Sequence, residues 1–229
     1  MTELEAINRM LSAIGQAPVT TVEETNPDVA ICMRTLYQVS QEVQSEGWTF
    51  NTYYCEKVPP RRDDNRIVIR NVAPPDERDY CIQMDLSYNT YYARDKESIA
   101  KADGTTVFLY NKTTQSFDWG TKEIEVDKVM YLSNLGTLPP TAYNYIVARG
   151  SAAVSMRTVG DTSQYQILRE QELYTRTQLQ QYETSQGDYT FFGHPKGHNY
   201  YVSYQLYHTL SPHPKHLSLI HISEPTRPY

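Results

Sequence analysis

The chain has 229 residues, and its 27 Asp and Glu residues outnumber its 21 Lys and Arg residues, which gives a formal charge of −6 at pH 7. This charge argues against a protein that coats nucleic acid, because non-specific binding depends on neutralising phosphates. Only 39% of the residues are hydrophobic. No apolar run approaches the roughly 18 residues of a membrane span, so we expect no membrane segment. The first residues also lack the basic and apolar regions of a secretory signal.

Cysteine and tyrosine usage narrows the class of protein further. The three cysteines, Cys32, Cys55 and Cys81, show no C-x-x-C spacing, which is typical of a reducing compartment rather than of a disulfide framework. Tyrosine is abundant, with 20 residues against 5 phenylalanines. Because tyrosine joins a large apolar ring to a polar tip, this bias favours surfaces that are buried on association.

The N-terminal part predicts two packed helices between about residues 3 and 46. Thr2 and Glu5 match a capping box, and apolar residues follow at helical spacing until Gly15. Asn26 is expected to cap the second helix, with Pro27 in its first turn.

After Gly47 the hydrophobic period changes from helical to two, which predicts an inserted antiparallel β region over residues 48–137. The alternation of large and small residues in 48–54 predicts the first strand. Further strands are expected at residues 66–70, 80–86, 105–110 and 122–132, with a turn at residues 103–104.

Two more helices are expected over residues 138–187, separated by Gly160 and Asp161. The fold class is therefore α+β: a helical body made of residues 1–47 and 138–187, with the β region inserted between its halves. The last helix is long and polar, which indicates that a lone protomer leaves it under-buried. Its thin apolar seam is the first set of candidate interface residues: Tyr165, Leu168, Leu179 and Tyr182.

Helical periodicity stops after Gly187, and residues 188–216 are predicted to form an extended interaction arm. Its aromatic side chains complete the candidate interface set: Tyr189, Phe191, Phe192, Tyr200, Tyr201 and Tyr204. Residues 217–229 resemble a translated sequencing adapter, so we expect this tail to be non-native and exclude it from the fold.

Catalytic and metal-binding patterns are weak. All six histidines follow residue 193, but their spacing does not suit a helical metal site, and we expect no metal or cofactor. Glu123, Glu125 and Asp127 would share one strand face about 7 Å apart. They could serve a polysaccharide hydrolase, with Glu123 and Glu125 as the acids, although a solvated strand face explains them better. A third possibility is a free carbohydrate-binding module that binds sugar through an exposed Trp119 or through tyrosines.

Several segments together resemble the tail tubular protein A family of T7-like podophages. They are residues 4–15, 26–30, 39–51, 138–140, 159–161, 187–189 and 199–201, of which 39–51 is the most specific. The resemblance covers about residues 1–210, and it departs at residues 95–102 and after about residue 217.

This resemblance implies a structural virion protein rather than an enzyme. It implies a head-to-tail adaptor at the head-tail junction of the tail, made in the host cytoplasm. Such proteins form a ring of about twelve subunits between the portal protein and the nozzle, tail tubular protein B. The resemblance also implies that tail fibres dock near this junction and that DNA passes through the lumen of the ring without sequence-specific binding.

Overall fold

The computed structural model describes residues 2–22, 26–71, 79–87 and 98–187. In these ranges the chain forms helices and antiparallel sheets, which confirms the mixed α+β class. The helical elements are α1 (Glu3–Ala13), α2 (Pro27–Gln44), η1 (Leu135–Thr137), α4 (Pro140–Thr158) and α5 (Thr162–Gly187). The strands are β1 (Thr52–Val58), β2 (Val68–Asn71), β3 (Tyr80–Leu86), β4 (Ser98–Asp103), β5 (Thr106–Asn111) and β6 (Ile124–Tyr131). No described helix is both long and apolar enough to cross a membrane.

The helix starts that the sequence predicted are confirmed by side-chain caps. The Thr2 hydroxyl accepts a hydrogen bond from the Glu5 backbone N–H at 3.2 Å, and the Asn26 side chain accepts one from the Asp28 N–H at 2.9 Å. These contacts satisfy N–H groups that have no partner inside the helix. Pro27 occupies the first turn of α2, where its missing N–H costs nothing.

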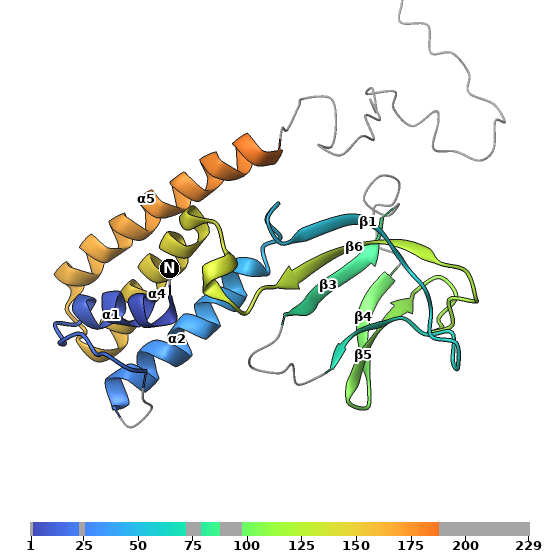
Figure 1. The fold of residues 1–229 in the computed structure, drawn as a ribbon, viewed down its shortest axis with the longest axis horizontal. Helices are drawn as coiled ribbons and strands as arrows, with labels where there is room; N and C mark the ends of the chain where they lie inside the picture. The colour runs from blue at the N-terminus through green and yellow to red at the C-terminus, as the bar shows by residue number, and fades with distance from the viewer. Residues whose placement is uncertain (1, 23–25, 72–78, 88–97, 188–229) are drawn as a thin grey trace, which may run out of the picture. The chain divides into compact units, whose positions relative to one another are not determined.

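All four α-helices contribute to one hydrophobic core, in which α4 has the central place. Helix α4 packs against α5 on one side and against α1 and α2 on the other (Figure 1). Its Tyr143, Tyr145 and Ile146 are fully buried. Gly150 permits the close approach of α1, since a Cβ atom there would lie 3.0 Å from the Cε of Met10.

The β region consists of two three-stranded antiparallel sheets, in the orders β1-β6-β3 and β2-β5-β4. A second core, which includes Ile67, Leu86, Leu109 and Val126, lies between them. Strand β4 is absent from the predicted strands, because its residues Ser98–Asp103 are almost all exposed and do not alternate. It pairs with β5 around the predicted turn at 103–104.

The prediction of a strand beginning at Trp48 is wrong, because β1 begins only at Thr52. Residues 45–51 form a turn, and Trp48 and Phe50 pack against the helical core. The aromatic residues Trp48 and Phe50 alternate with smaller residues as in a strand, but this segment forms a turn and is not part of β1. The turn is held by Asn51, whose side chain accepts a hydrogen bond from the Trp48 N–H at 2.9 Å.

Candidate assembly surfaces and the joint between helices and sheets

The apolar seam of α5 faces the chain's own helical core. Leu179 is fully buried there and Tyr182 packs at its edge, while Tyr165 and Leu168 are half-buried. The side chain of Leu179 therefore contacts its own protomer. Any surface that α5 offers to a neighbour consists of the half-buried residues and the face opposite the seam.

That opposite face, which we call the outer face of α5, carries Ile167, Glu170, Leu173 and Tyr174. Ile167 is 69% exposed, Leu173 50% and Tyr174 65%. Ile167 and Tyr174 are seven residues apart, so about two helical turns separate them on one side of the helix. These residues are absent from the candidate interface set because that set followed the single apolar seam of the helix. The spacing of seven was the available signal.

A buried carboxylate lies in the middle of α5 and is paired within the helix. Glu172 is only 6% exposed and forms an ion pair with Arg169 at 2.5 Å. On the neighbouring α4, Arg149 forms an ion pair with Glu42 of α2 at 2.7 Å. Buried charges need such partners, because losing one partner leaves an uncompensated charge. The Arg149–Glu42 pair therefore supplements the apolar packing between α4 and α2, whereas the Arg169–Glu172 pair lies within α5.

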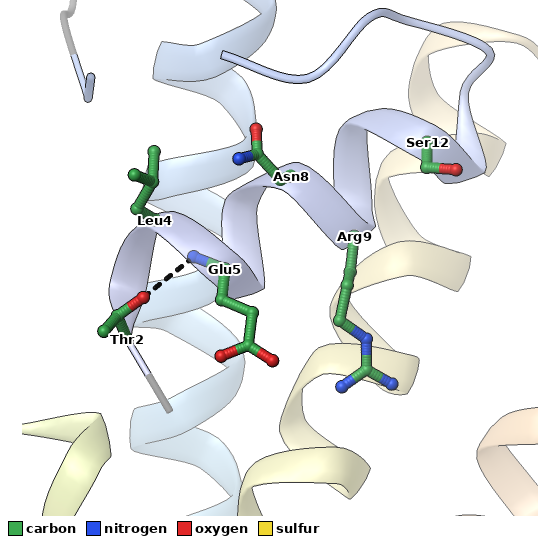
Figure 2. Close-up of a pocket in the computed structure, with 6 residues that line it drawn as sticks. All are labelled: Thr2, Leu4, Glu5, Asn8, Arg9 and Ser12. Atoms are coloured by element: carbon green, nitrogen blue, oxygen red, sulfur yellow. Dashed lines mark hydrogen bonds between the residues drawn. The ribbon is translucent and has the colours of Figure 1, made fainter. Parts of the chain in front are cut away.

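A shallow hollow of about 420 Å³ runs along the solvent side of α1. Figure 2 shows the six residues that line it, with Leu4 and Asn8 on one side of the helix and Glu5 and Arg9 on the other. Asn8 exchanges two hydrogen bonds with the backbone of Val19, at 2.8 and 2.9 Å. This exchange fixes the loop after α1 against Asn8, one of the residues that line the hollow.

The helices and the sheets meet at a set of residues that we call the joint: Gln44, Trp48, Thr49, Asn51, Leu132 and Glu183. The fully buried Gln44 accepts a hydrogen bond from the Leu132 N–H at 2.8 Å and donates one to the Leu132 carbonyl at 3.1 Å. A buried amide whose hydrogen bonds are all satisfied specifies one geometry, because the bonds are strong where water is excluded.

Asn51 completes the centre of the joint. Its amide donates hydrogen bonds of 2.8 Å to the carbonyls of Gln44 and Met130, so one side chain links the end of α2 to β6. Trp48 donates its indole N–H to the Val43 carbonyl at 2.8 Å. The polar residues Gln44 and Asn51 were not identified as important from the sequence, because their partners lie 88 and 79 residues away.

The end of α5 is attached to the same joint. The Glu183 carboxylate accepts hydrogen bonds from the Thr49 N–H at 2.9 Å and from the Thr49 hydroxyl at 2.8 Å. Hydrogen bonds to a charged acceptor are stronger than neutral ones. The turn between α2 and β1 is thus held both by α2, which precedes it, and by Glu183 of α5, which lies 134 residues after Thr49 in the chain.

Two tyrosines extend the joint into the first sheet. The rings of Tyr80 and Tyr131 lie 5.0 Å apart, and Gln41 of α2 donates a hydrogen bond to the Tyr80 hydroxyl at 2.8 Å. Burial raises the pKa of both hydroxyls above the usual value for tyrosine. Both side chains therefore remain neutral at physiological pH and act as packing and hydrogen-bonding groups.

The residues considered for carbohydrate chemistry have structural surroundings. Glu123 and Glu125 are exposed, while Ile124 and Val126 on the same stretch pack into the sheet core. Asp127 accepts hydrogen bonds from the Cys55 N–H at 2.8 Å and the Ser87 hydroxyl at 2.7 Å. Trp119 is half-buried and donates its indole N–H to the Leu109 carbonyl at 2.8 Å. This indole therefore belongs to the fold of the β region.

The predicted arm, residues 188–216, and the tail, residues 217–229, lie outside the described residues, as do all six histidines. The same holds for the arm's candidate interface residues: Tyr189, Phe191, Phe192, Tyr200, Tyr201 and Tyr204. Within the ranges that the structure describes, no cluster of three or more His, Cys, Asp or Glu side chains is arranged to hold a metal ion.

Comparison with known families gives a match over most of the chain. The model of the family Tube, described as "Tail tubular protein", matches residues 4–189. The chain belongs to the tail tubular protein family. A search of curated proteins finds none that matches it.

The family match places this tail tubular protein among the structural components of phage tails. The match includes the helices, both sheets and the joint. The segment with the most specific resemblance in sequence, residues 39–51, runs along the end of α2 and through the turn of the joint. The buried polar residues Ser40, Gln44 and Asn51 lie in this segment.

Proposed function

We propose that this tail tubular protein is the head-to-tail adaptor of a podophage of the T7 type, of the tail tubular protein A kind. About twelve copies form a ring between the portal protein and the nozzle, tail tubular protein B. Genomic DNA passes through the lumen of the ring during ejection, and tail fibres dock near its junction with the nozzle.

The observation that carries the proposal is the two-sided nature of α5. One side of this helix packs into the chain's own core, whereas Ile167, Leu173 and Tyr174 on the other side are at least half exposed. Exposed apolar residues that gather on one element are typical of interaction sites. A ring requires such a surface, since each subunit must bind its neighbour through two different faces.

The joint and the charge of the chain also support an adaptor. An adaptor must hold its binding surfaces in fixed positions, and the buried hydrogen bonds of Gln44 and Asn51 do this for the helices and sheets. The formal charge of −6 suits a conduit, because DNA adheres poorly to an acidic wall. In this proposal the arm at residues 188–216 lies on another chain.

The proposal is tested by mixing the purified full-length chain with the portal and nozzle proteins of the same phage, alone and together, and measuring complex masses by sedimentation. We expect a ternary complex in which this chain is required for the portal to bind the nozzle. Direct binding of portal to nozzle without it would contradict the adaptor role. Polysaccharide cleavage that Glu123→Gln abolishes would favour the hydrolase instead.

A further inference from the structure

The outer face of α5 and the hollow of α1 are two different surfaces of the same helical body. Each has a feature that the other lacks. The outer face presents protruding apolar side chains, with Tyr174 and Ile167 more than 60% exposed. The hollow offers a recess of about 420 Å³ beside the half-buried Leu4. In many protein interfaces, a protruding aromatic side chain of one partner fills a recess on the other and contributes much of the binding energy.

The outer face carries an acidic side chain and the hollow a basic one, although the exposed Glu5 also lines the hollow one turn before Arg9. Glu170 lies one turn before Tyr174 on α5 and is exposed, and no basic side chain of the described residues pairs with it. Arg9 lies at the hollow, where its guanidinium donates a hydrogen bond of 3.0 Å to the neutral side chain of Asn144. Within the described ranges, Arg9 has no carboxylate in ion-pair contact. Glu170 and Arg9 are thus the two opposite charges that a contact between these surfaces can pair, with Glu5 left toward solvent at the edge of the hollow.

We propose that the outer face of α5 in one protomer binds the α1 hollow of a second copy, with Tyr174 seated in the hollow and Glu170 paired with Arg9. Because the two surfaces differ, the contact is heterologous and leaves one free surface at each end of a pair. Repetition of the contact therefore builds a ring or a filament rather than a closed dimer. This inference rests on the proposed ring and identifies the surfaces that join its subunits.

The contact also explains why the exposed part of α5 is otherwise so polar. The other exposed residues of α5 are mainly Gln, Thr, Ser and Arg, which remain solvated in the separate protomer and suit the rim of an interface. Tyr174 itself accepts a hydrogen bond from Gln178 at 3.0 Å. This bond holds the ring's hydroxyl along the helix, so less side-chain freedom is lost on binding.

A charge-exchange cycle tests the pairing on the full-length chain. Four proteins are compared by sedimentation velocity over a range of concentrations: wild type, Glu170→Arg, Arg9→Glu and the double variant. We expect each single variant to weaken self-association about tenfold. The double variant should return to within about threefold of wild type, because the exchanged charges attract again. Arg176→Glu, an exposed change elsewhere on α5, serves as the control.

The anchor is tested separately with Tyr174→Ala, which should weaken self-association about tenfold or more. Thermal unfolding of the variants on α5 should match wild type, since the changed side chains are exposed, whereas Arg9→Glu should unfold slightly earlier because it loses its bond to Asn144. The inference is overturned if the chain assembles and the single variants have no effect, or if the double variant is no better than the single ones. In that outcome the ring proposal survives with other surfaces. A wild-type chain that never self-associates would overturn both.

Discussion

The side chain of Gln44, at the end of α2, exchanges two hydrogen bonds with the backbone of Leu132, which follows β6. The two residues are 88 positions apart, and their contact joins the helices to the first sheet. Gln44 is fully buried and Leu132 half-buried, so water replaces these bonds only in part if the side chain is lost. The joint is therefore the place where small changes should have large effects on stability.

Gln44→Ala should lower the free energy of unfolding by about 1–3 kcal/mol, because it leaves the N–H and carbonyl of the half-buried Leu132 without their side-chain partner and empties a buried site. Chemical denaturation measures the change. The matched control is Gln38→Ala on the exposed side of the same helix, which should change stability by less than about 0.5 kcal/mol. Equal effects of the two substitutions would show that the Gln44 bonds do not stabilise the joint.

Glu183→Ala should loosen the attachment of α5 to the turn before β1. The substitution removes the acceptor of the Thr49 N–H and hydroxyl, and we expect a loss of about 1–2 kcal/mol. Amide hydrogen exchange at Thr49 should rise by about tenfold, which corresponds to about 1.4 kcal/mol. Gln180→Ala, an exposed change on the same helix, is the control. Unchanged exchange at Thr49 would contradict this role for Glu183.

Asp127→Ala should destabilise the β region by about 1–3 kcal/mol, because the Asp127 carboxylate holds an irregular point in β1. Cys55 there has a φ of +53°, a conformation that costs energy in a residue with a Cβ atom, and its N–H bonds to Asp127. Glu125→Gln on the exposed face of β6 should leave stability within about 0.5 kcal/mol of wild type. A denaturation midpoint that falls more in Glu125→Gln than in Asp127→Ala would refute the role of Asp127 in holding β1 at Cys55.

Stability should fall as the pH rises from about 9 to 11. Burial raises the pKa of the Cys32 and Cys81 thiols from 9.0 to about 11. In the unfolded chain these thiols release their protons near pH 9, whereas the folded chain keeps them, so alkali favours unfolding. Melting temperatures measured across this range should decline, and less steeply in Cys81→Ala. A melting temperature that stays constant to pH 11 would contradict the burial of these thiols.

Local signals were sufficient to predict the elements whose residues act through near neighbours. The cap of α1 by Thr2, the cap of α2 by Asn26 and the alternation in β3 each depend on residues a few positions apart. Strand β4 was missed because its exposed side chains give no period, and its existence depends on pairing with β5.

Features that depend on distant contacts could not be predicted in the same way. Trp48 and Phe50 alternate like strand residues, but their packing partners are helices from both ends of the chain. The apolar seam of α5 was recognisable, yet its periodicity does not say that Leu179 meets the chain's own core. Only the packing of α5 on α4 separates the face used within the protomer from the face at Ile167 and Tyr174.

The most direct measurement is the mass of the purified full-length chain by light scattering, at increasing concentration and in the presence of the portal protein. We predict a single species of about twelve times the 26.5 kDa of one chain. When the portal protein is present, we expect it to set the number of copies of this chain in each ring. A species of 26.5 kDa under all of these conditions would contradict the ring.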